Sequence, residues 1–113
     1  MGPRHDQAPE QLVGRGASQG TAMGRAVVVR GADDFPKVQI GDILVCEVTA
    51  PSWTPLFEIA AGIVTERGGV LSHAAIVARE LGLPAIVGVE GLVGTIVDGQ
   101  VLTIDGTTGV VLL

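Results

Sequence analysis

Residues 68–84 read Gly-Gly-Val-Leu-Ser-His-Ala-Ala-Ile-Val-Ala-Arg-Glu-Leu-Gly-Leu-Pro, and this stretch decides the architecture of the chain. Ser72 is a favoured N-cap residue, so a helix is predicted to begin at His73. Gly82 supplies a C-cap, and Pro84 prevents the helix from continuing. Four apolar side chains fall within one arc of about 100°, which predicts the buried face of this helix: Ala74, Val77, Ala78 and Leu81.

Short apolar runs separated by glycine turns surround this helix. Strands are predicted at 25–30, 42–47, 62–65, 85–87 and 101–104, and residues 109–113 close the sheet. A turn or single helical turn is predicted at 32–36, and a flexible, turn-rich segment at 14–20. A short helix is expected from Thr54, as N-cap before Pro55, to about Ala61. The fold class is therefore a compact mixed α/β domain. It is β-rich, with more than one sheet and one main helix, and differs from a doubly wound nucleotide fold.

The length and composition predict one globular domain. The chain has 113 residues, of which 47% are hydrophobic and 17% charged. Residues 1–11 are polar and aperiodic, so we expect a flexible N-terminal arm with a solvated His5, followed by the domain at 12–113. The arm has no apolar core of the kind found in signal peptides.

Charge and residue usage exclude several classes of protein. The net charge of −5, with seven scattered Lys and Arg residues, argues against a nucleic-acid partner. No apolar run approaches the length of a membrane span. The lone Cys46 excludes an internal disulfide, fits a reducing cytoplasm and is expected to be a buried small side chain. Two distant histidines and one cysteine offer too few ligands for a metal site.

The start of the predicted helix suits a phosphate group. It presents unpaired N–H groups and a partial positive charge, and Gly68 and Gly69 let backbone approach closely. His73 supplies an imidazole, a nucleophile that is largely neutral at pH 7. The chain has neither a phosphate-cradling Gly-x-x-x-x-Gly-Lys-Ser/Thr loop nor a carboxylate cluster for Mg²⁺. These features predict a group that receives and hands on a phosphoryl group without activating one from ATP alone. They leave open the alternative of an ordinary histidine at a helix start.

Residues 65–88 closely resemble the phosphohistidine signature of the phosphoenolpyruvate (PEP)-utilising enzymes. The resemblance extends to Gly41-Asp42-Ile43-Leu44-Val45, to the Thr49-x-Pro51-x-Trp53-Thr54-Pro55 loop and to the segment from Asp98 to Gly109. It covers roughly residues 12–113. This family includes phosphoenolpyruvate synthase, pyruvate phosphate dikinase, enzyme I of the sugar phosphotransferase system and rifampicin phosphotransferase.

The resemblance implies a swivelling β/β/α phosphohistidine domain whose phosphorylated residue is His73. Thr65, Ser72 and Arg79 are the further candidates for phosphate positioning or packing beside it, together with the glycine pair. The implied partners are an ATP-grasp nucleotide-binding domain and a phosphoenolpyruvate/pyruvate or other acceptor domain, in cis or in trans. ATP and Mg²⁺ are expected on a partner, with no cofactor bound by this domain.

One position departs from the family pattern. Many family members carry a threonine two residues before the histidine, and some of them are regulated by phosphorylation of that threonine. Leu71 stands at that position here, so this form of control is not expected. The competing hypothesis is a non-catalytic binding module of the same fold, which uses an exposed Trp53 loop and the edge around His73.

Overall fold

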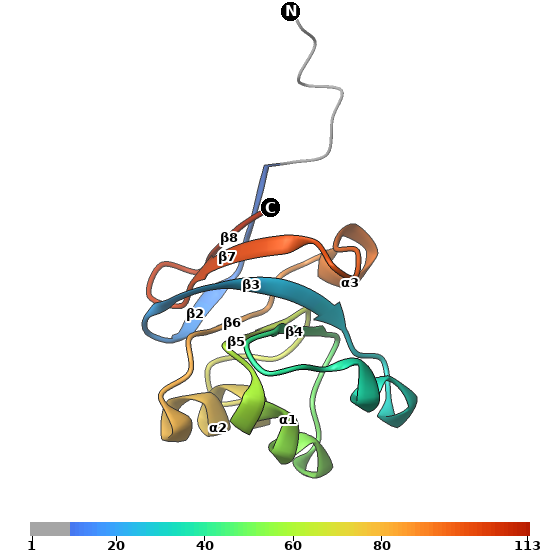
Figure 1. The fold of residues 1–113 in the computed structure, drawn as a ribbon. Coiled ribbons are helices and arrows are strands. Elements are labelled where there is room, and N and C mark those ends of the chain that lie inside the picture. The colour runs from blue at the N-terminus through green and yellow to red at the C-terminus, as the bar shows by residue number, and fades with distance from the viewer. Residues whose placement is uncertain (1–9) are drawn as a thin grey trace, which may run out of the picture.

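The computed structural model describes residues 10–113, and the chain there folds into three layers (Figure 1). An antiparallel layer lies over a mainly parallel layer, and helices α1 (Thr54–Ile59) and α2 (His73–Leu81) cover the outer face of the parallel layer. This arrangement confirms the predicted strand-rich α/β fold with one main helix. Residues 1–9, which hold most of the predicted arm and His5, lie outside the described residues, and the boundary between arm and domain stays a prediction.

The strands form a continuous hydrogen-bonded series that folds back on itself. Its order is β1-β8-β7-β3-β4-β5-β6-β2. The strands are β1 (Gln11–Val13), β2 (Arg15–Ser18), β3 (Thr21–Val28), β4 (Ile43–Cys46), β5 (Gly62–Thr65), β6 (Ala85–Val87), β7 (Val101–Asp105) and β8 (Val110–Leu112). β1 and β2 stand at opposite ends of this order, yet only Gly14 separates them in the chain. The first strands therefore join the two layers at one side.

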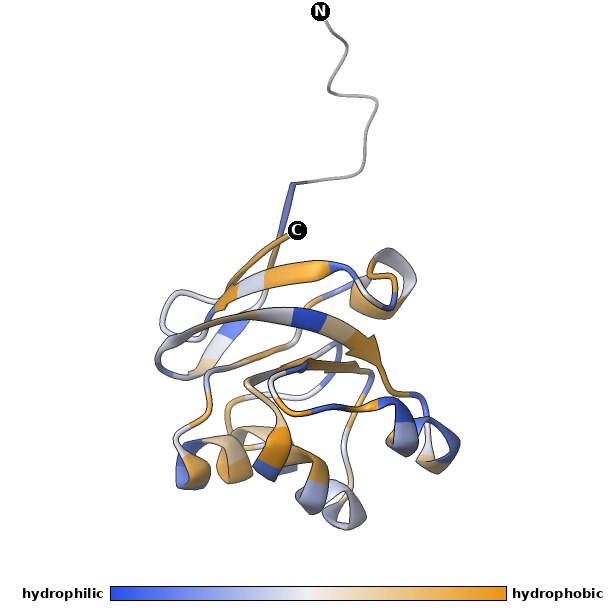
Figure 2. Ribbon diagram, viewed as in Figure 1, coloured by the Kyte–Doolittle hydropathy of each residue, from blue (hydrophilic) through white to orange (hydrophobic). Residues whose placement is uncertain are grey.

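Two hydrophobic clusters fill the spaces between the layers. Alternate residues of a strand point to opposite faces, and β4 shows this with Leu44 facing the helices while Ile43 and Val45 face the antiparallel layer. Hydrophobic colour runs along most of β7 and the end of β3 (Figure 2). Leu92 of α3 (Leu92–Thr95) belongs to the cluster between the two sheet layers. This short helix is not predicted from the sequence.

Helix α2 begins and ends where the sequence predicts. The Ser72 hydroxyl accepts a hydrogen bond from the Ala75 amide at 3.4 Å, and Gly82 adopts the left-handed conformation at φ 73°. Its buried face differs from the prediction: Ala74, Ala75 and Ala78 are buried, whereas Leu81 is 45% exposed. The small alanine side chains allow the helix to lie close to the sheet.

Three further expectations are corrected by the structure. Residues 15–18 of the supposedly flexible segment form β2, which pairs with β6. Thr54 is the first residue of α1 and does not cap it, because its hydroxyl donates to the Pro51 carbonyl oxygen at 2.8 Å. Trp53 ends the turn η3 (Pro51–Trp53) and is half-buried, with its ring 5.5 Å from that of Phe35. Phe35 belongs to η2 (Ala32–Lys37), which confirms the helical turn expected there.

Cys46 ends β4 and is buried, as predicted. Burial raises the pKa of its thiol to about 12, so the thiol stays protonated at neutral pH. Within residues 10–113 no helix is long and apolar enough to cross a membrane.

Candidate functional site

Two parallel strands bring the segments of the candidate site together. β4 and β5 run in register, with Cys46 opposite Thr65 at their carboxyl ends. The pairing continues past the strands, because the Glu66 amide donates to the Cys46 carbonyl and the Arg67 amide to the Glu47 carbonyl. The segments that follow the two strands therefore leave the same edge of the sheet side by side.

His73 is the first residue of α2, and its half-buried ring is held in place on one side. Its Nδ1 atom lies 2.8 Å from the Oγ1 atom of Thr49, in the segment after β4. The ring also meets Phe57 of α1 edge to face, with the ring centroids 5.9 Å apart. No hydrogen bond among the described residues involves the other nitrogen, Nε2. The contact with Thr49 thus orients the imidazole and leaves Nε2 available.

The glycine pair shapes the approach to the helix. Gly68 adopts φ +101°, a conformation that side chains disfavour, and a Cβ atom there would lie 3.1 Å from the Ser72 Cβ. Gly69 has neither constraint, and its carbonyl accepts a hydrogen bond from the Ser72 amide at 3.0 Å. The first of the two glycines is therefore the one that the backbone requires.

A hollow of about 150 Å³ lies at the start of α2. It is lined by Val48, Thr49, Thr65, Arg67, Gly68, Ser72, His73 and Ala74. Arg67 is the one charged side chain among these lining residues. Its Nε lies 3.2 Å from the Glu47 Oε2, and both side chains are more than half exposed.

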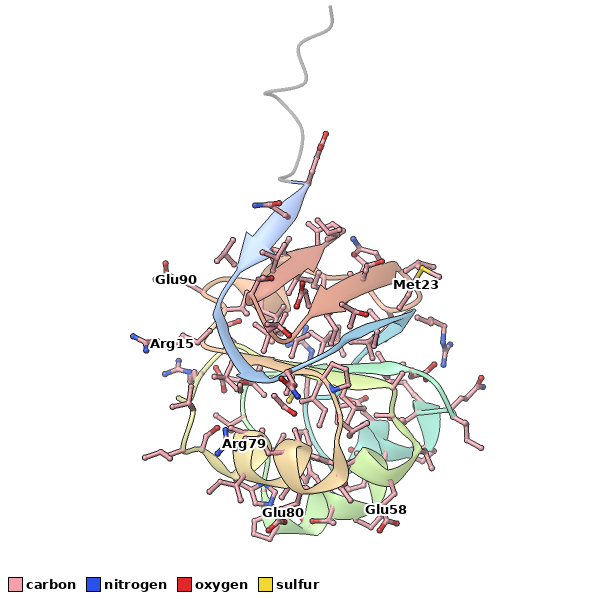
Figure 3. The ribbon with its side chains drawn as sticks, turned by 90° about the vertical axis from the view of Figure 1, so that its left-hand side faces the viewer. Arg15, Met23, Glu58, Arg79, Glu80 and Glu90 are labelled. Atoms are coloured by element: carbon pink, nitrogen blue, oxygen red, sulfur yellow. The ribbon has the colours of Figure 1, made fainter. Side chains whose placement is uncertain are left out.

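Four of the residues expected at the site line this hollow: Thr65, Gly68, Ser72 and His73. Gly69 flanks the hollow without lining it. Arg79 is not brought to it, because its guanidinium donates to the Ala17 carbonyl oxygen at 2.9 Å, on the side of α2 that meets β2 (Figure 3).

Two polar residues that line the hollow, Thr49 and Arg67, were not among the site residues predicted from the sequence. Each follows the end of a predicted strand, and parallel strands place such positions at one edge. That rule was the available signal, and using it required knowing that β4 and β5 are parallel neighbours. Among the described residues, no group of three or more His, Cys, Asp or Glu side chains is arranged to hold a metal ion.

A family model and several curated relatives place the chain in one family. A family model described as the mobile domain of PEP-utilising enzymes matches residues 38–109. Rifampicin phosphotransferase of Streptomyces sviceus is 48% identical over 94% of this chain. A probable phosphoenolpyruvate synthase of Methanothermobacter thermautotrophicus is 47% identical over 87% of it. The chain spans only 12% and 14% of the lengths of these two relatives.

A solved structure supports the same grouping. The solution structure of an Enzyme I protein matches with a TM-score of 0.60 and 30% sequence identity. The match covers 69% of this chain and 32% of that one.

Proposed function

This chain belongs to the family of PEP-utilising enzyme mobile domains, and on that premise we propose that it is a phosphoryl carrier with His73 as the carrying residue. The observation that carries the proposal is the geometry of the imidazole. Thr49 occupies Nδ1, while Nε2 has no hydrogen-bond partner among the described residues. The ring belongs to a hollow at a helix start, where amide groups and the helix dipole favour an anion.

The proposed step is an in-line transfer to Nε2. In the tautomer with the proton on Nδ1, that N–H donates to the Thr49 hydroxyl and Nε2 carries a lone pair. This pair forms the new N–P bond while the bond from phosphorus to the donor's leaving group breaks, and the leaving group keeps the electrons. Transfer to the acceptor reverses the roles, because the acceptor's lone pair attacks phosphorus and Nε2 recovers its own.

The neighbouring residues divide the supporting tasks. Ser72 caps the helix and fixes the start of α2, and Gly68 and Gly69 give the phosphoryl group access to backbone. Thr65 is buried and holds the loop by donating from Oγ1 to the Arg67 carbonyl oxygen at 2.8 Å. For Arg79 the contact with Ala17 supports a packing role.

The donor and acceptor sites are proposed to lie on partner domains. We propose an ATP-grasp nucleotide-binding domain with ATP and Mg²⁺ as one partner, and a phosphoenolpyruvate/pyruvate or other acceptor domain as the second. Either is present in cis or in trans, in the cytoplasm. The curated relatives support this division, since they are several times longer than the region that this chain matches.

Incubation of the chain with radiolabelled ATP and Mg²⁺ and a nucleotide-binding domain taken from a homologous synthase tests the proposal. We expect an acid-labile, base-stable phosphate on one residue, mapped to His73 by mass spectrometry. His73→Ala is expected to remain unlabelled. Equal labelling of that variant would show that the carrying residue was assigned wrongly. Binding of the partner domain with no labelling of the wild type would favour the non-catalytic module.

A further inference from the structure

The hollow beside His73 has a single source of full positive charge among its lining residues, and that source already has an ionic partner. Arg67 pairs with Glu47 at 3.2 Å. A phosphoryl group on His73 would bring a charge of about −2 to this edge of an acidic protein. Arg67 is therefore the lining residue that could compensate the negative charge of the phosphorylated state.

The backbone of Arg67 is held firmly while its side chain is not. Its amide donates to the Glu47 carbonyl at 3.0 Å, and its carbonyl accepts from the Thr65 hydroxyl at 2.8 Å. The Arg67 side chain is 68% exposed, and the Glu47 side chain is 58% exposed. Exposed ion pairs of this kind contribute little to stability, so the guanidinium can change partner without a large loss.

The adjacent carboxylate, Glu66, does not compete for Arg67. Its Oε1 atom accepts a hydrogen bond from the Val93 amide at 2.8 Å, near the start of α3. Glu47 is thus the carboxylate that holds Arg67 in the unphosphorylated protein. A phosphoryl group offers the planar guanidinium two parallel, charge-assisted hydrogen bonds, which are stronger than a single exposed contact.

We propose that Arg67 exchanges partners during the carrier cycle, pairing with Glu47 when His73 is free and with the phosphoryl oxygens when His73 is phosphorylated. This inference rests on the proposed carrier function. Under it, Glu47 keeps the guanidinium at the rim of the hollow between transfers. Arg67 contributes charge compensation that the helix start alone does not provide.

Phosphoramidate tests the exchange without any partner domain. The Nε2 lone pair forms the new N–P bond while the N–P bond of the reagent breaks, and the departing nitrogen takes a proton from the solvent and leaves as ammonia. We expect Arg67→Gln to lower the second-order rate constant for phosphorylation of His73 about tenfold, and Arg67→Lys to lower it less because the charge remains. Glu47→Gln is expected to raise the rate constant about twofold, since the guanidinium no longer leaves a carboxylate.

Two controls separate this effect from folding and from net charge. Arg15→Gln removes one positive charge from an exposed side chain of β2 that points away from the molecule (Figure 3), and it should change the rate constant by less than about twofold. Circular dichroism and thermal melts of each variant establish that it is folded. In addition, the guanidinium ¹⁵N signals of Arg67 should shift when the wild type is phosphorylated, and should not shift in His73→Ala.

The outcomes are distinct. If Arg67→Gln behaves like Arg15→Gln and the Arg67 signals stay in place, the exchange is overturned while phosphorylation of His73 stands. If Glu47→Gln slows phosphorylation as much as Arg67→Gln, the pair is only structural and the exchange is again overturned. If a homologous kinase domain and phosphoramidate both leave His73 of the wild type unlabelled, the carrier function itself fails, and the inference fails with it.

Discussion

Thr49 contacts Nδ1 of His73, so the two ring nitrogens have different roles. Nδ1 orients the ring, and Nε2 is left for phosphoryl transfer. Thr49 makes this 2.8 Å contact with Nδ1 from the segment after β4. The ring is therefore held by a residue distant in the sequence and not by its own helix. A hydroxyl at this position can accept from Nδ1–H or donate to Nδ1, and the proposed carrier function uses the first arrangement, in which the lone pair is on Nε2.

Replacing Thr49 tests this assignment. Thr49→Val keeps the shape of the side chain but removes the hydroxyl, and we expect phosphorylation of His73 to slow about tenfold, equivalent to about 1.4 kcal/mol in the barrier. Thr49→Ser keeps the hydroxyl and should stay within about threefold of the wild type. Imidazole ¹⁵N spectra should show the proton on Nδ1 in the wild type and a mixture of tautomers in Thr49→Val. An unchanged tautomer in that variant would contradict the assignment.

The glycine pair gives a second comparison between neighbouring residues. Gly68→Ala forces a side chain into φ +101° and against Ser72, so we expect a loss of about 1–2 kcal/mol in the free energy of unfolding. Gly69→Ala meets nothing within 4 Å and should change stability by less than about 0.5 kcal/mol. Urea denaturation of both variants measures the difference, and equal losses would show that the conformation of Gly68 is not what constrains this loop.

At the level of elements, the success of sequence reasoning depended on whether the signals were local. The start and end of α2 are encoded by Ser72, Gly82 and Pro84, within or next to the helix, and both were predicted correctly. β2 was missed because Gly16 lacks a side chain to reveal the strand pattern, and its pairing partner lies far along the chain. Thr49 and Arg67 were not assigned to the site for the same reason, since only the pairing of β4 with β5 brings them to His73.

The two predicted helix caps make a matched test of this point. Ser72→Ala removes the acceptor for the Ala75 amide, and the free energy of unfolding should fall by about 1 kcal/mol. Thr54→Ala, at the other residue predicted to be a cap, removes only an exposed bond to the Pro51 carbonyl and should cost about half as much or less. Chemical denaturation of both variants checks the order. A larger loss for Thr54→Ala would mean that the start of α1 is capped after all.

Across the whole molecule, an ion pair between the exposed Arg25 and the buried Asp42 connects the two layers through their shared strand. Asp42, just before β4, accepts hydrogen bonds from the guanidinium of Arg25 on β3, the shorter at 2.8 Å, and from the Gln39 amide. Burial pushes the pKa of Asp42 upward, but the hydrogen bonds from Arg25 and Gln39 together outweigh it and hold the pKa below its ordinary value of 3.8. The carboxylate is therefore favoured in the folded protein.

This shift predicts how stability responds to acid. A carboxyl group with a lowered folded-state pKa contributes stability above its unfolded-state pKa, and that contribution is lost as the pH falls through the folded-state value. We expect Asp42→Asn to lower the free energy of unfolding by about 2 kcal/mol at pH 7, because the charge-assisted hydrogen bonds from Arg25 to this carboxylate are lost. The difference in the free energy of unfolding between this variant and the wild type should become smaller as the pH falls from about 4 to 2. Urea titrations at several pH values measure this, and a gap independent of pH would exclude Asp42 as a source of acid sensitivity.

The closure of the sheet by its first strands also has a consequence for biosynthesis. Gln11–Val13 pairs with Val110–Leu112, and Arg15–Ser18 pairs with Ala85–Val87. Within this domain β1 is synthesised before β8, so the backbone edge of β1 has no native partner until β8 has emerged from the ribosome. Contacts this distant in sequence slow folding and prolong the exposure of unpaired strands. A nascent chain that stalls before Val110 therefore exposes the unpaired edge of β1 to aggregation.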